Sequence, residues 1–124
     1  MIAPARIEGL LALQPELAQA MVHGDRRPYL VALIVPRDET IAAAAKASGG
    51  KPELAALAGD KALRAAVEKA VERVNRELPV PERIRKFIVA DEAFSVANEM
   101  MTPTLKIRRH KIRAVYAERL DALY

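Results

Sequence analysis

The sequence predicts an α+β domain in which helices flank a small, mainly antiparallel sheet of three strands. Its length of 124 residues suits one compact domain and leaves no room for a second lobe. Apolar residues recur three or four positions apart in several segments, which indicates amphipathic helices. Three short runs rich in strand-forming residues are bounded by turn residues. We therefore expect a single domain over residues 1–124.

The first third of the chain predicts a helix followed by a β-hairpin. Pro4 stands where a first helical turn tolerates a missing N–H, and apolar residues then recur on one face over residues 4–13. Residues 18–23 and 29–35 have the composition of strands, and residues 24–28 between them contain glycine, aspartate and proline. This arrangement predicts an antiparallel pair.

The middle of the chain predicts two helices and a third strand. Asp38 is expected to cap an alanine-rich helix that ends at Gly49. A longer amphipathic helix is expected from about Lys61 until Pro79 stops it. Residues 85–90 then read as the third strand.

The last quarter predicts an irregular segment over residues 91–104 and a final helix. The inner face of that helix is expected to carry four apolar residues: Ile112, Val115, Leu120 and Leu123.

Composition excludes several classes of protein. The chain has no cysteine, which excludes disulfide scaffolds, zinc ribbons and thiol catalysis. Its longest apolar run, residues 29–35, is far shorter than the roughly 20 residues of a membrane-spanning helix. Because no secretory leader is evident, we expect a cytoplasmic location, which leaves room for peripheral attachment at a membrane.

The most informative segment is residues 101–109, Met-Thr-Pro-Thr-Leu-Lys-Ile-Arg-Arg. Pro103 stiffens a loop, and Lys106 lies between two apolar residues just before an arginine pair. Taken alone, such a lysine is ordinarily a solvated loop residue. The sequence has no catalytic triad, metal-ligand cluster or glycine-rich phosphate loop, and its two histidines, His23 and His110, are expected at a strand end and a helix start.

This segment resembles the lysine loop in the C-terminal domain of adenylate-forming enzymes, which include acyl-CoA synthetases, peptide-synthetase adenylation domains and luciferases. The version in residues 102–108 is closer to the long-chain fatty acyl-CoA synthetases than to branches in which a Ser-Gly pair precedes the lysine. Residues 2–8 resemble the segment after the interdomain hinge, residues 24–36 the family hairpin, and residues 116–124 the family ending. The likeness covers essentially the whole chain.

The resemblance implies specific site residues. Lys106 would be the catalytic lysine of ATP-dependent acyl-adenylate formation. Arg108, Arg109 and Arg76 would contact phosphates of ATP or CoA. The alternative for Arg108 and Arg109 is a solvated face or a salt-bridged support, and for Arg76 it is an ordinary arginine on a helix surface. A shift of one position in the comparison would substitute Asn75 for Arg76.

The resemblance also implies substrates and a partner. ATP, CoA and a fatty acid would be substrates and Mg²⁺ a cofactor, with none bound tightly to this domain alone and no metal ligand in it. The partner would be the N-terminal adenylation domain of the same enzyme, so we expect the isolated domain to be inactive. Met1 replaces the usual asparagine and the preceding hinge motif is absent, so we expect an excised or truncated piece. Glu99 departs from the family at a position where glycine is common.

Two other classes of function stay open. Residues 106–113 are rich in lysine and arginine, so a small basic phosphate-binding or nucleic-acid-binding module is one alternative. The five aromatic residues all lie outside that cluster, which argues against base stacking, so we expect no nucleic-acid partner. The other alternative is a noncatalytic domain that docks to a partner protein.

Overall fold

The computed structural model describes residues 3–124. Two residues lie outside the described range: Met1, which replaces the usual asparagine, and Ile2, which begins the segment resembling the post-hinge region. The elements follow in the order α1 (Pro4–Ala12), β1 (Leu17–His23), β2 (Leu30–Pro36), α2 (Asp38–Ser48), α3 (Leu54–Leu57), α4 (Lys61–Arg76), the short 3₁₀ helix η1 (Val80–Glu82), β3 (Ile84–Val89) and α5 (Arg109–Asp121).

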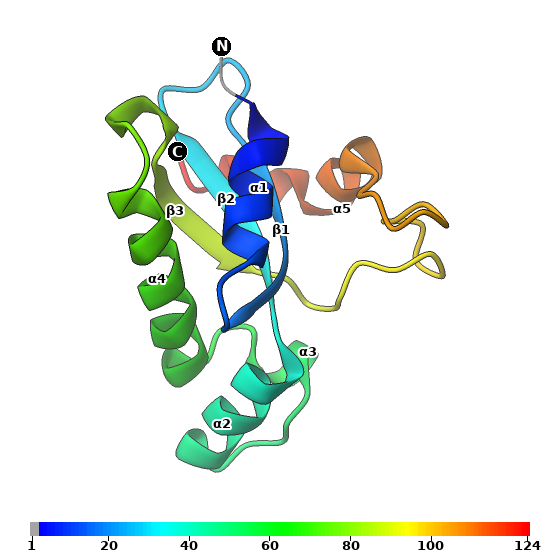
Figure 1. Ribbon diagram of the computed structural model, residues 1–124. Coiled ribbons are helices and arrows are strands. Elements are labelled where there is room, and N and C mark those ends of the chain that lie inside the picture. The colour runs from blue at the N-terminus through cyan, green and yellow to red at the C-terminus, as the bar shows by residue number, and fades with distance from the viewer. Residues whose placement is uncertain (1–2) are drawn as a thin grey trace.

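The three strands form one sheet in the order β1-β2-β3, flanked by helices, as Figure 1 shows. This confirms the α+β class and the three-stranded sheet. β1 and β2 pair antiparallel, with Ala20 opposite Ile34, whereas β2 and β3 pair parallel, with Leu33 opposite Ile88. The sheet is therefore mixed. Helices α2, α3 and α4 form a crossover that returns the chain to the end of the sheet where β2 began, so that β3 runs parallel to β2.

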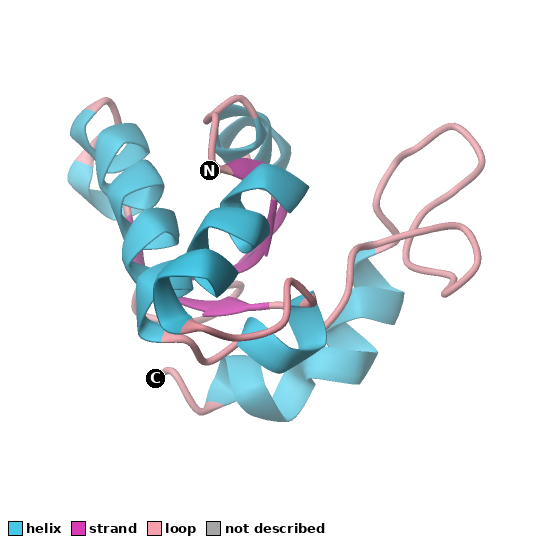
Figure 2. Ribbon diagram, turned by 90° about the horizontal axis from the view of Figure 1, so that it is seen from below, coloured by secondary structure: helices cyan, strands magenta, loops and turns pink. Residues whose placement is uncertain are grey.

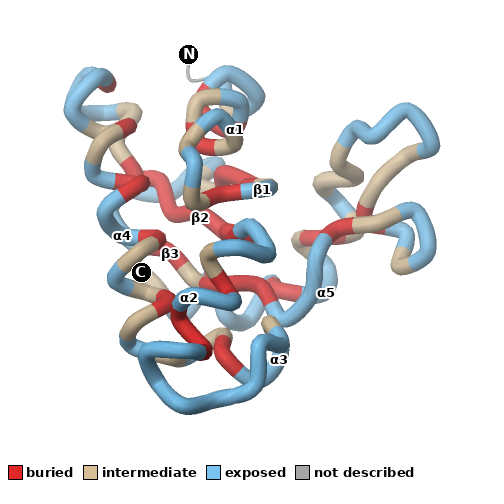
Figure 3. Tube along the Cα trace, turned by 60° about the horizontal axis from the view of Figure 1, so that its bottom comes forward, coloured by how far each residue is buried: buried red, intermediate tan, exposed pale blue. Residues whose placement is uncertain are grey.

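The central strand β2 supplies both hydrophobic cores, because its side chains alternate between the two faces of the sheet. Leu30, Ala32 and Ile34 join a first core with α1, α2 and α4. The intervening residues of β2 join a second core with α5. Figures 1 and 2 show α1 and α4 on one face of the sheet and α5 on the other. Every residue of β2 is buried, as in a strand covered on both sides (Figure 3).

The helix ends show where local signals held and where they did not. Gly49 ends α2 with a φ of 72°, the left-handed conformation expected of a glycine at this position. The prediction that Asp38 caps α2 was wrong, because Arg37 occupies the cap position and no side chain bonds to the free N–H groups there. Asp38 lies in the first turn instead, where its charge favours the helix dipole. Asp60 does cap α4, accepting from the Leu63 N–H at 3.1 Å.

The inner face of α5 differs from the expected one at Val115. Ile112 and Leu120 are fully buried as predicted, but Val115 is 63% exposed and Tyr116 is buried in its place. Positions 112, 116 and 120 follow one another at four-residue spacing on one stripe of the helix. The Tyr116 hydroxyl accepts a hydrogen bond from the Asp91 N–H at 3.1 Å, so burying the ring leaves its polar end satisfied.

A search of the helices within residues 3–124 finds none that is both long and apolar enough to cross a membrane.

Candidate functional site

Residues 100–108, here called the lysine loop, form a narrow projection between β3 and α5. Figures 1 and 2 show it extending away from the sheet. Met101 pairs with Ile107 in an isolated antiparallel bridge, and the Arg108 N–H donates to the Met100 carbonyl at 2.8 Å. The two arms of the loop are thus joined at its base, and Lys106 lies directly beside the closing pair.

Thr102 fixes the backbone on both sides of Lys106. Its N–H donates to the Lys106 carbonyl at 2.8 Å, and its carbonyl accepts from the Leu105 N–H at 2.8 Å. Its hydroxyl oxygen accepts from the Lys106 N–H at 3.2 Å and lies 3.0 Å from the Thr104 hydroxyl. Leu105 adopts a φ of 65°, a conformation that nonglycine residues rarely enter without such support.

The Lys106 side chain is exposed on this fixed backbone. Within residues 3–124, no hydrogen bond or ion pair shorter than 4 Å involves its ammonium group. The neighbouring Leu105 side chain is 72% exposed. The loop therefore presents a cation beside an apolar group, an arrangement suited to an anion at an interface that excludes water.

The base of the lysine loop is anchored by residues that sequence reasoning missed. The Gln19 side-chain amide donates to the Phe94 carbonyl at 3.0 Å and accepts from the Phe94 N–H at 2.8 Å. The Asn98 side-chain oxygen accepts from the N–H groups of Ser95 and Met100, at 3.0 and 3.1 Å. The Ser-x-x-Asn spacing signals such a turn, whereas nothing local signals the role of Gln19, which lies on β1.

Glu99, which precedes the lysine loop, occupies a backbone position that suits glycine. It adopts a φ of 65°, the conformation that favours glycine, which is common at this position in the resembled family. Its carboxylate lies 3.3 Å from the Lys111 ammonium on α5.

Arg109 faces the interior of the domain. Its guanidinium donates to both carboxylate oxygens of Glu8 on α1, at 2.6 and 2.8 Å, and to the Val22 carbonyl at 3.0 Å. The hydrogen bonds with Glu8 raise the pKa of Arg109 above its usual value. Glu8 is itself buried and also accepts from the Val22 N–H at 2.7 Å. These contacts match the salt-bridged support rather than a free phosphate ligand.

The two other predicted arginines lie apart from each other. Arg108, the last residue of the lysine loop, stands at the N-cap position of α5 and is partly exposed. Arg76 is exposed at the end of α4, across the sheet from α5. Its neighbour Asn75 bonds both the N–H and the carbonyl of Ile84 at 2.9 Å, which fastens α4 to β3. Lys106 and Arg108 are thus brought together, and Arg76 is not.

The His23 side chain is more buried than the sequence predicts for a residue at the end of a strand. Its side chain is 13% exposed, and its Nδ1 accepts from the Arg113 Nε–H at 3.3 Å. Burial, reinforced by the Arg113 charge, lowers the pKa of His23 below the usual histidine value. His110 lies in the first turn of α5, as expected.

Comparison with known families and proteins gives one consistent assignment. The family model for the AMP-binding enzyme C-terminal domain matches residues 1–124. Over 99% of its length, the chain is 31% identical to long-chain-fatty-acid–CoA ligase 1 of Cavia porcellus and 32% identical to long-chain-fatty-acid–CoA ligase FadD15 of Mycobacterium tuberculosis. It covers only 18% and 21% of those two proteins, about a fifth of their length.

Solved structures agree. The adenylation domain of a carboxylate reductase from Mycobacterium chelonae superposes over 99% of this chain, with a TM-score of 0.81 and 28% identity, and the chain covers 18% of it. An acyl-CoA synthetase from Brucella canis shares the fold over 95% of this chain, with a TM-score of 0.54 and 22% identity, and the chain again covers 18%. From its sequence and its fold, this chain belongs to the family of AMP-binding enzyme C-terminal domains.

Proposed function

We propose that this chain is the C-terminal domain of a long-chain fatty acid–CoA ligase, with Lys106 as the catalytic lysine of acyl-adenylate formation. The single observation that carries this proposal is the exposed Lys106 side chain on a hydrogen-bonded, projecting loop. Membership in the family and the ligase relatives support it. The partner is an N-terminal adenylation domain, and the isolated chain is inactive.

The chemistry of adenylation explains the need for a lysine. A carboxylate attacks the α-phosphate of ATP, so two anions approach and negative charge accumulates on phosphate oxygens in the transition state. An ammonium group is a compact charge with three donors on a flexible stem, so it reaches both anions at once. The fixed backbone at Lys106 restricts this reach to one region, which lowers the entropy lost on closure.

A second face of the domain would serve CoA. Arg76 ends α4, which lies on one face of the sheet, whereas Lys106 lies in the loop that leads into α5 on the other face. A rotation between the two half-reactions would present each face in turn, as the resemblance implies. Arg108 would assist Lys106 with phosphate.

Mg²⁺ would enter the active site of the complete enzyme bound to the phosphates of ATP. Within residues 3–124, no three histidine, cysteine, aspartate or glutamate side chains are grouped so that they would hold a metal ion.

The basic cluster gives the nucleic-acid alternative little support. Arg109 is held by Glu8, Lys111 by Glu99, and Arg113 bonds His23. The charges of Arg109 and Lys111 are thus paired with carboxylates within the fold, whereas Arg113 bonds a neutral histidine and keeps its charge.

The test joins this domain covalently to the adenylation domain of a long-chain fatty acid–CoA ligase. We expect Lys106→Ala to lower fatty-acid-dependent pyrophosphate release about 100-fold or more, because it removes a charge that acts mainly in the transition state. Thioester formation from a supplied acyl-adenylate and CoA should change little. Lys46→Ala, which removes another exposed lysine from α2, is the matched control.

Two results would contradict the proposal. Equal pyrophosphate release by the parent and the Lys106→Ala fusion, both folded, would remove Lys106 from the adenylation step. An equal loss in both half-reactions would show that the substitution disturbs domain docking rather than adenylation chemistry.

A further inference from the structure

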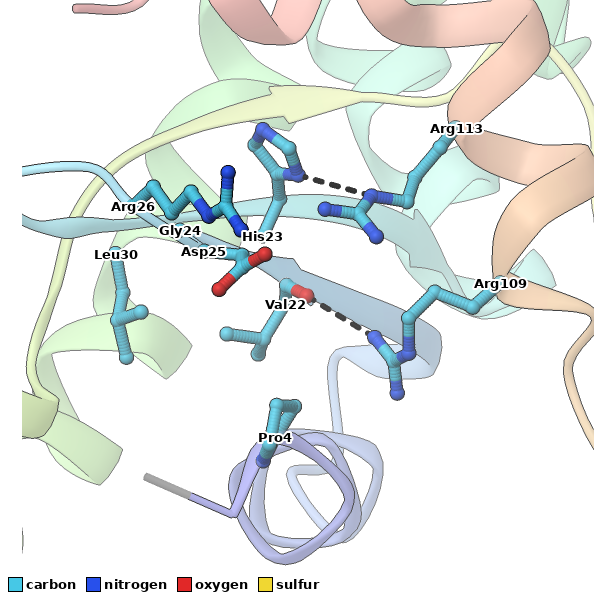
Figure 4. A pocket seen from close by; sticks show the side chains of 9 residues that line it. All are labelled: Pro4, Val22, His23, Gly24, Asp25, Arg26, Leu30, Arg109 and Arg113. Carbon is cyan, nitrogen blue, oxygen red and sulfur yellow. Dashed lines mark hydrogen bonds between the residues drawn. The ribbon is translucent and has the colours of Figure 1, made fainter. Parts of the chain in front are cut away.

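A concave site lies where the β1–β2 turn and the first turns of α5 meet the start of α1. Its cavity has a volume of about 480 Å³. Val22, Leu30 and Pro4 form an apolar floor, and arginines stand around it (Figure 4). None of the roles proposed for Lys106, Arg108 or Arg76 uses this cavity.

Arg113 is oriented in this cavity by a neutral histidine. Its Nε–H donates to His23 Nδ1 at 3.3 Å, and Figure 4 shows the two terminal nitrogens turned toward the cavity. Within residues 3–124, no carboxylate lies within 4 Å of the Arg113 guanidinium. Since burial and the arginine charge favour neutral His23, the histidine orients Arg113 without neutralising it.

The β1–β2 turn supplies a second cation. Arg26 adopts a φ of 60° and lines the cavity. Its neighbour Arg27 pairs with Asp121 at 2.7 Å and stacks over the Tyr124 ring at 4.7 Å, which fixes the turn against the C-terminal segment. A Cβ at Gly24 would approach Leu30 Cδ2 to 2.4 Å, so any larger residue here would displace the Leu30 side chain from the cavity floor.

The charge balance favours an anion. Arg109 also lines the cavity, but its charge is matched by Glu8, and His23 is neutral near pH 7. Arg113 and Arg26 remain, opposed by one carboxylate, Asp25. The cavity therefore carries an excess of positive charge over an apolar floor.

We propose that this cavity binds the phosphate group of a small molecule, with Arg113 as the principal ligand. Guanidinium groups bind phosphate through paired N–H donors, and two cations from different elements fix its position. The apolar floor would accept an uncharged part of the same molecule. Inorganic phosphate, pyrophosphate, AMP and CoA share the recognised phosphate and differ in the chemical group attached to it.

The experiment is an NMR titration of the 124-residue chain at low ionic strength with each of these four compounds in turn. We expect saturable shifts at the amides of residues 24–26 and 109–113. Tighter binding of AMP or CoA than of phosphate would identify an organic phosphate, and the tightest binding by pyrophosphate would identify an inorganic ligand. Because binding is read directly, this result is independent of the role of Lys106.

Variants decide whether the named residues bind the anion. Arg113→Gln should raise the dissociation constant about tenfold or more, since charge-assisted hydrogen bonds are lost. Asp25→Asn should lower it several-fold, a gain that misfolding does not produce. Arg37→Gln removes an exposed arginine beyond the other end of β2 and should have little effect.

Either of two outcomes would overturn the proposal. One is the absence of saturation with all four compounds. The other is an equal weakening by Arg113→Gln and Arg37→Gln, which would show that the chain attracts anions only through its net charge.

Discussion

At the scale of single residues, the Glu8–Arg109 pair joins α1, β1 and α5. Glu8→Ala leaves the Arg109 guanidinium without its carboxylate and the Val22 N–H without its acceptor. We expect a loss of about 3 kcal/mol in the free energy of unfolding, measured by urea titration, because breaking one side of a buried pair is costly. Asp91→Ala, which breaks an exposed pair with Arg119, should cost less than about 1 kcal/mol. Equal losses would contradict a special role for Glu8.

A second prediction at the residue scale concerns His23 and the dependence of stability on pH. Because its pKa is lower in the folded state than the usual 6.5, the unfolded chain takes up a proton first as the pH falls. The stability contributed by neutral His23 is present above about pH 6.5 and is lost as the pH falls below that value. Urea titrations at pH 7.5 and 5.5 should show this loss in the parent, and His23→Asn should reduce it. If the stability of His23→Asn depended on pH as strongly as that of the parent, His23 would not be the source of the loss.

At the scale of elements, the lysine loop depends on Thr102. Thr102→Val keeps the shape of the side chain but removes the acceptor for the Lys106 N–H. A hydrogen bond of this kind contributes about 0.5–1.5 kcal/mol, so amide exchange at Lys106 should accelerate up to about tenfold. Thr102→Ser retains the hydroxyl and should preserve protection. In the covalent fusion, Thr102→Val should slow adenylation while the pH profile stays unchanged. Parent-like exchange in Thr102→Val would remove Thr102 from this role.

At the scale of the whole molecule, the two cores should unfold together because β2 belongs to both. Ile112→Ala in the second core should lower stability by about 2–5 kcal/mol. Helical circular dichroism and tyrosine fluorescence should still report one midpoint. Val115→Ala, three positions further along the same helix but exposed, should change stability by less than about 0.5 kcal/mol. Separate midpoints would show that the two faces fold independently.

Local chemistry was enough to predict several element boundaries from the sequence. Pro4 begins α1, Gly49 ends α2 in the left-handed conformation and Pro79 follows α4, as their backbone restrictions predict. The resemblance in residues 102–108 predicted the family. The family model over the full chain confirmed it.

Features that depend on residues far apart in the chain could be known only from the fold. The buried stripe of α5 runs through Tyr116 rather than Val115, because the Asp91 N–H supplies a partner for the phenol. The parallel pairing of β3 depends on the helical crossover rather than on any strand residue. Arg108 and Arg109 look alike in the sequence, yet it is Arg109 that pairs with Glu8. Local composition carries no information about a carboxylate 101 positions away along the chain, since only folding brings the two groups into contact.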